Sequence, residues 1–499
     1  MHFFFHKKTG VISITALVFI AVFISVLTGL LSNVISQKRV QVAKEQGDQA
    51  LQIAEAGLDY YKWHLAHYKD DTQDGTGAPG PYIHDYTDRD TGEIIGKFSL
   101  EIMGEYQCGE ISTIKITSTG WTDKNPNITK IVSVKYGRPT IGEYSYVLDS
   151  DVWAGADRQI YGPFHSNKGI RMDGTNYAQV TSAIINPPGW NCTSNYGCNP
   201  AQPNAVGVVG NGPGFALWSF PVASISFNSI AGDIGKMKNN TASTTPGICT
   251  AGQTYGCYFP SWGGSPSGKG YHAVFQNDGR MNLYRVTNLK KTREMGPSGI
   301  IADEYTNIGN QVLVTGSPFT LPAACPIVFV EDNLFIDGTV KGKISIVAAD
   351  LDGTNPDLVL SGNINYTTTN GNDGLLAIGE NRVIIPLDSP NNMTVNGIFI
   401  AQKGYFGRNY ISSIPWGTSA GSYFCGAGWD TCLKRNSMNI YGTVVSSGRV
   451  GTKWTSGGVY VQGYNFRTDY YDSKISDYPP PFTPHISDTF KFLKWSQDR

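Results

Sequence analysis

The strongest hydrophobic pattern in the chain is a long apolar run close to its amino terminus. Residues Val11 to Ile35 carry no charged side chain, and Lys7 and Lys8 stand just before them. A helix of this length can cross the roughly 30 Å hydrocarbon core of a membrane. The run is too long for a typical signal peptide, and no small-residue cleavage signal follows it. We therefore predict a membrane-spanning helix that keeps its basic flank in the cytoplasm.

The helical pattern continues beyond the apolar run. Small and then bulky side chains recur at steps of three and four, which places them on one helix face. Small side chains allow another helix to approach closely, so we predict contacts with neighbouring helices there. The bulky residues are expected to pack on the chain's own globular part. The predicted helix covers residues 11–69, with the contact residues Ala43, Gly47, Ala50 and Ala54 followed by the packing residues Leu58, Tyr61 and Leu65.

The beginning of the chain resembles the amino termini of type IV pilins and of the related type II secretion pseudopilins. These proteins have a short basic leader that ends in glycine, then an apolar helix with an amphipathic continuation. The resemblance implies that residues 1–10 form a leader, that a prepilin peptidase cleaves after Gly10, and that the new terminus, Val11, is methylated. The stretch QIAEAGLDYY, Gln52 to Tyr61, resembles the AEAG signature of PilX-type minor pilins.

One position departs from the pilin pattern. Major pilins usually carry glutamate at the fifth mature position, where this chain has Thr15. A carboxylate inside a membrane costs about 2.5–3.5 kcal/mol, and the family keeps it because it pairs with the terminal amine of a neighbouring subunit. PilX-type proteins and tip pseudopilins also lack it. The resemblance therefore implies a minor or tip subunit rather than a repeating shaft subunit.

Alternation of apolar and polar residues begins after the helix. The segment DDTQDGTGAPGPY ends the helix with charge, glycine and proline. Residues 97–102, 112–118 and 130–135 then alternate, with turn residues between them, which is typical of antiparallel strands with one buried face. We predict a small antiparallel sheet over 82–137, and a small sheet on a long helix is the head that the pilin resemblance implies.

The remainder, residues 140–499, consists of short apolar runs separated by Gly, Asn or Asp. Examples are NLFIDGTVKGKISIVA (Asn333–Ala348) and MTVNGIFIAQKGYFG (Met393–Gly407). Such runs favour a parallel β-helix or solenoid, although a sandwich or jelly roll gives the same local signals. The predicted fold class is mainly β with one long N-terminal α-helix. The Pro-rich segment Asp477–His485 and the final residues Phe490–Trp495 are expected to cap the stack.

Two stretches interrupt this pattern and are predicted to be inserted loops. Residues 187–298 have little periodicity and are rich in proline, glycine and asparagine, whereas residues 404–432 are dense in Tyr, Phe and Trp. Loops of this kind often carry function. Exposed aromatic residues in 404–432 would form an adhesive or sugar-stacking surface. The alternative is that they simply cover one face of the solenoid.

Charge and cysteine content bear on the partners of the chain and on its cellular compartment. Lys+Arg 39 against Asp+Glu 40 leaves a net charge of -1, which gives the whole chain no attraction for nucleic acid. Six of the eight cysteines form close pairs in loop-like stretches, and local disulfides would place them outside the cytoplasm. Free buried thiols are the alternative, and Cys108 and Cys325 are left unassigned. The predicted pairs are Cys192–Cys198, Cys249–Cys257 and Cys425–Cys432.

The sequence offers no catalytic assignment. No nucleophile elbow, zinc-protease motif or phosphate-binding loop occurs in the context that its chemistry requires. Asp149, Asp151 and Asp157 have the ligand type that Ca²⁺ prefers, but we expect them to be turn residues. His165 is expected to make a structural hydrogen bond. We therefore predict no catalytic residue, no metal and no cofactor.

These patterns predict a minor or tip subunit of a type IV pilus or related pseudopilus. Its large β domain would serve assembly priming, adhesion or surface contact. The expected partners are other pilin subunits, prepilin peptidase, the membrane and a surface glycan or protein receptor, with no nucleic acid. The expected location is the inner (cytoplasmic) membrane, crossed once, with the β domain outside the cytoplasm or carried on a pilus. The alternatives are a membrane-anchored β-helix enzyme acting on polysaccharide and a structural surface protein outside any filament.

Overall fold

The chain forms two compact units in a computed structural model. The model describes residues 10–69, 71–241, 249–250, 252–262, 269–413, 432–475, 477–487 and 489–498. The helix unit consists of Met1–Gly104, Ile114–Tyr136 and Phe492–Arg499, and the β unit of Glu105–Thr113 and Gly137–Lys491. The coarse expectation of one long N-terminal helix followed by mostly β structure is confirmed.

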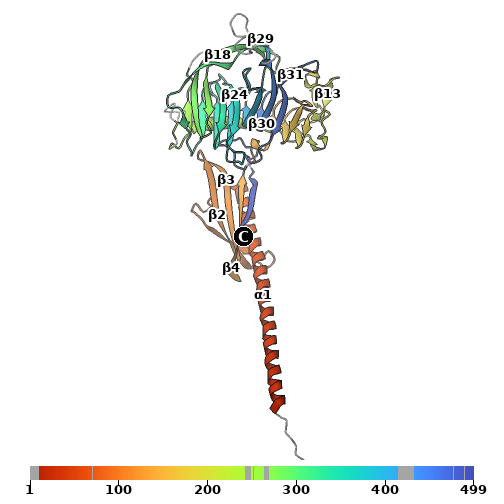
Figure 1. Cartoon of the computed structure of the whole chain (residues 1–499), viewed down its shortest axis with the longest axis vertical. Helices are drawn as coiled ribbons and strands as arrows, with labels where there is room; N and C mark the ends of the chain where they lie inside the picture. The colour runs from red at the N-terminus through yellow and green to blue at the C-terminus, as the bar shows by residue number, and fades with distance from the viewer. Residues whose placement is uncertain are drawn as a thin grey trace, which may run out of the picture. The chain divides into compact units, whose positions relative to one another are not determined.

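Helix α1 (Gly10–His67) is continuous over 58 residues and has two different parts. Its side chains from Ser13 to Glu45 are exposed, and an apolar stretch within this part is long enough to cross a membrane. From Gln46 onward one face is buried against a sheet, which lies along only part of the helix (Figure 1). The continuous helix extends from apolar sequence into amphipathic sequence without a break, as the periodicity predicts.

The sheet of the helix unit has five strands. Strand β1 pairs with β2 in antiparallel fashion. The predicted sheet over 82–137 therefore corresponds to four strands, and the carboxyl-terminal strand adds a fifth. The order is β1 (Tyr82–Thr87), β2 (Ile94–Gln107), β3 (Glu110–Thr122), β4 (Asn125–Gly137) and β33 (Lys491–Asp498).

The position of β33 differs from the expectation that the final residues cap the β stack. This strand pairs beside β4, and the Phe492 ring lies 4.6 Å from the Tyr136 ring, centroid to centroid. The Lys62 ammonium lies 5.1 Å from the Phe492 centroid. The Phe492 ring gains aromatic and cation–π contacts when β33 is an edge strand of this sheet. It would lose these contacts if the segment were a solvated cap.

The small residues of α1 pack against the chain's own sheet, which corrects part of the predicted division of the helix face. Ala50 and Ala54 are fully buried, and a Cβ added at Gly120 of β3 would collide with their backbone. Gly47 is buried beside Lys130, whereas Ala43 is exposed. Small residues here bring the helix backbone close to a strand, so of the four predicted contact residues only Ala43 presents its side chain outward. Leu58, Tyr61 and Leu65 are buried in the same unit, as the periodicity predicts.

Short parallel strands form three ladders in the β unit. The first ladder runs through β16 (Cys257–Phe259), β21 (Ile327–Val330), β23 (Lys343–Ala348), β25 (Gly374–Gly379), β27 (Asn392–Ala401), β30 (Lys434–Ser446), β5 (Tyr146–Leu148), β8 (Phe164–Ser166), β11 (Val180–Ser182) and β15 (Trp218–Ser219). The second contains β17 (Tyr271–Phe275), β22 (Leu334–Val340), β24 (Leu358–Tyr366), β26 (Val383–Ile384) and β28 (Phe406–Gly407). The third contains β24, β27, β30, β32 (Val459–Tyr470), β7 (Arg158–Ile160) and β10 (Thr175–Asn176).

The chain enters this stack in its middle. Strand β5, the first strand of the stack along the chain, pairs with the late strand β30, and β7 pairs with β32. From there the early strands extend to one end at β15, and the stack resumes at the other end with β16. The backbone of Thr140 bridges that of His485, so the β unit begins and ends at one place.

From β21 to β5, the first ladder is apolar on both faces. Its inward residues join the main core, whereas its outward residues, such as Phe329 and Val347, form a second core. Helix α2 (Asn228–Asn239) covers this second core with Ile234 and Met237. Phe482, from the Pro-rich segment that was expected to cap an end, packs on the same face instead. Burial on both faces explains the near-continuous apolar runs of these strands.

The stretch 187–298, predicted as one inserted loop, contains several elements of the stack. A two-stranded sheet of β12 and β13, strand β15, helix α2 and strands β16 and β17 all lie within it. Near its end begins a long antiparallel hairpin of β18 and β19, which also pairs with β29. The bounds are β12 (Trp190–Cys192), β13 (Gln202–Ala205), β18 (Arg280–Met295), β19 (Ile301–Leu313), β20 (Phe319–Thr320), β29 (Tyr410–Ser413) and β31 (Lys453–Ser456), with a separate parallel sheet of β6 (Val152–Ala154), β9 (Ile170–Met172) and β14 (Val208–Val209).

Candidate functional site

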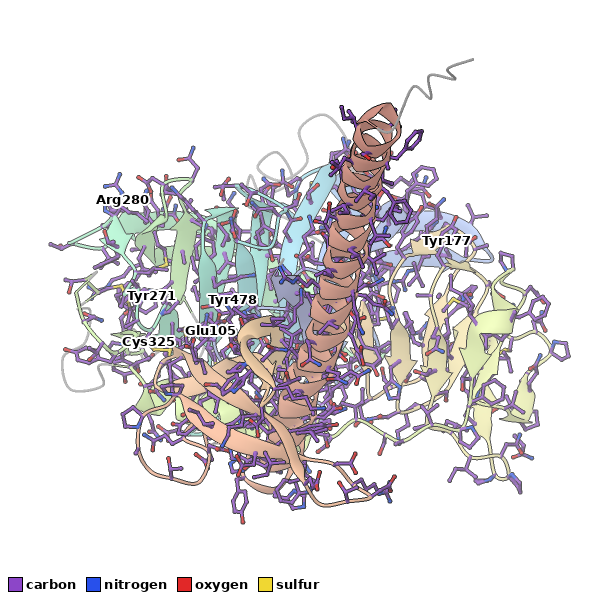
Figure 2. The ribbon with its side chains drawn as sticks, turned by 90° about the horizontal axis from the view of Figure 1, so that it is seen from below. Glu105, Tyr177, Tyr271, Arg280, Cys325 and Tyr478 are labelled. Carbon is purple, nitrogen blue, oxygen red and sulfur yellow. A yellow bond between two sulfur atoms is a disulfide. The ribbon has the colours of Figure 1, made fainter. Side chains whose placement is uncertain are left out.

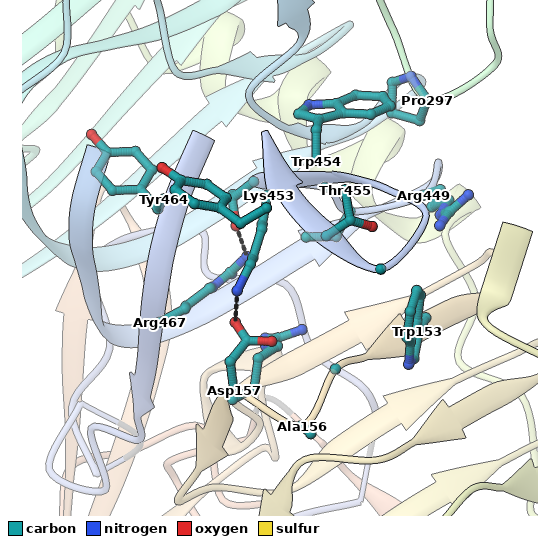
Figure 3. A pocket seen from close by; sticks show the side chains of 17 residues that line it. Trp153, Ala156, Asp157, Pro297, Arg449, Lys453, Trp454, Thr455, Tyr464 and Arg467 are labelled. Atoms are coloured by element: carbon teal, nitrogen blue, oxygen red, sulfur yellow. Dashed lines mark hydrogen bonds and ion pairs between the residues drawn. The ribbon is translucent and has the colours of Figure 1, made fainter. Parts of the chain in front are cut away.

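The β unit contains a cavity of about 310 Å³ between the turn after β6 and strand β31 (Figure 3). Four aromatic and four cationic side chains are among the residues that line it. A pocket of this size, with a few convergent polar groups among aromatic walls, has the usual dimensions of a small-molecule site. The lining includes Trp153, Arg158, Arg449, Lys453, Trp454 and Arg467.

Trp153 is held rigidly in one wall of the cavity. Its indole N–H donates to Asp173 Oδ2 at 2.8 Å, and the same carboxylate accepts from Arg171 Nε at 2.6 Å. The backbone of Gly197 approaches the ring so closely that an added Cβ would lie 2.7 Å from it. Gly197 has φ 76°, a left-handed conformation that suits glycine. The loop Cys192–Cys198 thus supports this tryptophan from behind.

The same loop positions Arg449. Its guanidinium donates to the carbonyl oxygen of Asn195 at 2.7 Å and lies 4.7 Å from the Tyr196 ring centroid. Burial lowers the pKa of Arg449 from its ordinary value, while Tyr196 and Asp151 oppose that shift. An arginine remains protonated throughout the physiological range, so Arg449 brings a partly desolvated positive charge to the cavity.

Trp454 stands on another part of the wall. Its indole N–H donates to the carbonyl oxygen of Arg408 at 2.9 Å, and its ring meets Tyr410 edge-on at 5.7 Å. In the view of Figure 3, Arg449 lies between Trp454 and Trp153. Because both indole N–H groups are satisfied by protein, the two rings can offer apolar surface without leaving a polar group unpaired.

Below these residues lies a buried charge cluster. Asp469 accepts hydrogen bonds from Arg158, from Arg467 at 2.9 Å and from the Tyr146 hydroxyl at 2.7 Å. Burial alone would raise the pKa of Asp469, but the charges of Arg158 and Arg467 and the bonds from Arg158 and Tyr146 hold it below its usual range. Two guanidinium groups therefore share one carboxylate.

The cavity and its immediate support carry a small excess of positive charge. Four cations line it, namely Arg158, Arg449, Lys453 and Arg467. Three carboxylates oppose them. Asp157 pairs with Lys453 at 3.2 Å, Asp469 pairs with the two buried arginines, and Asp151 acts on Arg449. The balance of four minus three leaves one positive charge, which favours a ligand with a single negative charge.

The cysteines that the sequence paired are close in space wherever the structure describes both partners. Sulfur–sulfur distances are 1.90 Å for Cys192–Cys198 and 1.96 Å for Cys249–Cys257. Cys425 lies outside the described residues, so its predicted bond to Cys432 stays a prediction. Cys108 and Cys325, which the sequence left unassigned, are bonded to each other at 2.14 Å (Figure 2 labels Cys325). Their sequence separation of 217 residues gave no local signal for this pairing.

The predicted processing site lies at the start of the described chain. Gly10 is the first residue of α1, and Val11 and Thr15 follow within its first turns. Residues 1–9 of the leader lie outside the described part, so cleavage after Gly10 and methylation of Val11 stay predictions.

The residues weighed for catalysis or metal binding have structural partners. His165 is buried between Thr181 and Asn167, each at 3.0 Å, and burial lowers its pKa. Asp151 accepts from the backbone N–H of Gly169 at 2.8 Å. Asp149 accepts from Asn167, and Asp157 pairs with Lys453. Among the described residues no group of three or more His, Cys, Asp or Glu side chains is placed to hold a metal ion.

One serine–histidine–aspartate group occurs on the second ladder. His272 Nε2 lies 3.0 Å from Asp337 Oδ2 and 3.4 Å from Ser361 Oγ. A catalytic triad needs the carboxylate on one ring nitrogen and the serine on the other. Here both approach Nε2, while Gln311 occupies Nδ1 at 2.8 Å. This arrangement supports the sheet rather than activating a nucleophile.

Aromatic surface appears where the sequence did not place it. Most of the aromatic stretch 404–432 lies outside the described residues, and Phe406 within it is buried. On the third ladder, Tyr470, Tyr161 and Tyr177 stack with nearly parallel rings, 5.2 and 4.6 Å apart. These rings are partly exposed, but they cover one another's faces. The pairing of β32, β7 and β10 creates the stack, so no local sequence pattern could reveal it.

Comparisons with known proteins give little support for a family. No protein-family model matches the chain, and no curated protein matches it at a significant level. Among solved structures, the competence-associated pilin ComZ from Thermus thermophilus aligns over 91% of this chain and 97% of its own length. The identity is 13% and the TM-score is 0.29. A likeness at this TM-score falls below what a shared fold requires, so it does not assign the chain to a family.

Proposed function

We propose that the chain is a minor or tip pilin-like subunit of a type IV pilus or related pseudopilus. The observation that carries this proposal is helix α1. Its first part is apolar and exposed, and its second part packs on a small sheet of the same unit. A simple anchor would end near the membrane surface, whereas a helix that continues into a head domain can pass among other subunits. Thr15, in place of the carboxylate of shaft subunits, supports a PilX-like position outside the repeating shaft.

The β unit is the part that such a subunit would present. The three parallel ladders support a three-faced parallel β-helix, whose stacked coils give a rigid surface. The disulfides suit an oxidising compartment, which supports a location of this unit outside the cytoplasm, beyond a single-pass inner-membrane helix. In this role the protein needs no catalytic group, and its partners are other pilin subunits, prepilin peptidase, the membrane and a surface ligand.

Processing provides the decisive test. Co-expression with a prepilin peptidase should yield a mature chain that begins with methylated Val11, as measured by intact-mass spectrometry of the sheared pilus fraction. Gly10→Val should block cleavage, because the pilin resemblance places the cut directly after this glycine. Gly29→Ala is the matched control, since a Cβ there meets nothing within 4 Å. Surface-located protein that retains Met1 would leave only an anchored protein.

The same experiment separates the two alternative functions. A structural surface protein outside any filament would be absent from the sheared fraction. A membrane-anchored enzyme on polysaccharide would release oligosaccharides from a glycan substrate, which we do not expect from the purified chain.

A further inference from the structure

We propose that the cavity between β6 and β31 binds a terminal acidic sugar, a pyranose that carries one carboxylate. This inference deepens the contact role in the proposed function and rests on it for its biological meaning. The binding itself depends only on the β unit. It rests on the aromatic walls, the positioned arginine and the charge balance of the cavity.

The walls fit a sugar ring. Trp153 and Trp454 have their indole N–H groups bonded to Asp173 and to the carbonyl of Arg408, which fixes the planes of both rings. The C–H face of a pyranose packs on such an apolar aromatic face, while its hydroxyl groups need hydrogen-bonding partners at the edge. Thr455 lines the cavity and is exposed for that purpose, whereas the hydroxyl groups of Thr452 and Tyr460 are bonded within the protein. A volume of about 310 Å³ admits one or two rings rather than a long chain.

The charge fits a single carboxylate. Arg449 reaches the cavity with its orientation fixed by Asn195 and Tyr196. A guanidinium group matches a carboxylate through two parallel hydrogen bonds. Arg158 and Arg467 share Asp469 beneath the cavity and add positive potential there. The net excess of one positive charge is balanced by one carboxylate.

The same observations disfavour nucleic acid. Proteins that bind nucleic acid neutralise many phosphates with a broad array of basic side chains. This chain has a net charge of -1, and the cavity with its supporting carboxylates carries an excess of only one cation. A cavity of about 310 Å³ is also too small to hold a duplex.

The loop closed by Cys192 and Cys198 preorganises the site. Gly197 backs Trp153, while Asn195 and Tyr196 hold Arg449, so one short loop fixes both recognition groups. A ligand then binds without ordering these side chains, which reduces the entropic cost of binding. Opening this loop should weaken binding even though neither cysteine touches the ligand.

The test compares two ligands that differ only in the carboxylate. Methyl β-D-glucuronide and methyl β-D-glucoside are titrated into the purified full chain in detergent micelles, and binding is followed by saturation-transfer NMR and calorimetry. We expect the glucuronide to bind at least about tenfold more tightly than the glucoside, as a charged hydrogen-bonded pair provides. Equal binding of the two, or binding of neither, would overturn the proposal.

Variants locate the site. Arg449→Gln should remove the preference for the glucuronide. Trp153→Ala should lower the affinity for both ligands, and Trp153→Phe should retain part of that affinity. Arg280→Gln and Tyr177→Ala are the matched controls, since both residues are exposed and neither lines the cavity. Circular dichroism checks that each variant is folded. Unchanged preference in folded Arg449→Gln would refute the assignment of this cavity.

A third ligand tests the competing chemistry. Adenosine monophosphate offers an aromatic base and a phosphate to the same cavity. We expect it to bind more weakly than the glucuronide, because the cavity balances one negative charge. Tighter binding of the nucleotide would replace the sugar assignment with a nucleotide one. None of these measurements depends on cleavage or pilus assembly, so failure here is distinct from failure of the proposed function.

Discussion

The helix unit and the β unit both depend on close backbone approach at glycine, but for different reasons. In the helix unit, Gly120 lies inside a regular strand and lets the backbone of α1 approach at Ala50 and Ala54. In the β unit, Gly397 and Gly442 are paired with each other between two ladders, and their φ angles are 153° and 136°. There glycine provides a bend that other residues rarely adopt.

This difference reflects how the sequence determines the fold of each unit. The helix unit is built from long elements whose buried faces follow a helical or alternating period. The β unit is built from short strands whose partners are far away in the sequence, as in the pairing of Val147 with Val445. A change in the first unit should therefore act through one packed interface, and a change in the second through the closure of the stack.

The largest expected effect concerns the Cys108–Cys325 bond of the β unit. This bond joins residues that are 217 positions apart in the sequence. Loop-closure entropy therefore predicts that combining Cys108→Ser and Cys325→Ser lowers the free energy of unfolding by about 5 kcal/mol. The Cys192–Cys198 bond spans a sequence separation of only 6 residues. The matched double substitution of these two cysteines should therefore lower the free energy of unfolding by about 2 kcal/mol. Calorimetry with and without reductant measures both. Equal losses would show that chain closure does not dominate the stability of this unit.

The next effect concerns the buried carboxylate of the β unit. Asp469→Ala leaves Arg158 and Arg467 buried without their carboxylate and should destabilise the unit by about 3–5 kcal/mol. The control Asp157→Ala removes a partly exposed pair with Lys453 and should cost about 0–1 kcal/mol. Chemical denaturation of each variant, followed by tryptophan fluorescence, gives the difference.

The lowered pKa of Asp469 predicts how the stability of the β unit changes with pH. Because the folded-state pKa lies below the unfolded value of roughly 3.9, its stabilising contribution is present above that value and is lost as the pH falls through the folded pKa. The difference between the parent chain and Asp469→Ala should therefore shrink under acid conditions. A difference that grows below pH ~4 would contradict the ion-pair account.

A smaller effect compares two glycines of α1. Alanine at either position gains helix propensity of about 1 kcal/mol. At Gly57 the new Cβ would lie 2.8 Å from the Phe98 ring, so we expect a net loss of about 1–3 kcal/mol from overpacking. At Gly47 the nearest atom is Lys130 Cε at 3.5 Å, an ordinary contact, so Gly47→Ala should be neutral or stabilising. Hydrogen exchange of the α1 amides distinguishes the two outcomes.

The smallest effect on stability is expected at Ala43. This residue is exposed on α1, so Ala43→Leu should change the free energy of unfolding by less than about 0.5 kcal/mol. If other pilin helices pack at this point, the same change should reduce recovery of the protein in the sheared pilus fraction. Lys44→Ala, also exposed, serves as the control. Full recovery of Ala43→Leu would remove Ala43 from the assembly contact.

Part of the cavity was within reach of sequence reasoning. The Cys192–Cys198 loop was identified from spacing, although its role behind Trp153 and Arg449 was not. Arg449 and Trp454 lie in a stretch that reads only as short strands and turns, and no local motif marks them. They line one cavity with Trp153 because the nearby strand β32 pairs with β7, which brings residues some 300 positions apart into neighbouring coils.

The sequence by itself determined the long helix, the small sheet beside it and the mainly β character of the rest. These features depend on local periodicity, which burial of one face imposes on neighbouring residues. The tertiary structure alone decided that Ala50 and Ala54 face the chain's own sheet and that the last strand joins that sheet. It also decided that Cys108 bonds Cys325 and that the stack is entered at its middle. Each of these depends on which distant surfaces meet, and that choice is made by the total area buried in the closed fold rather than by any short segment.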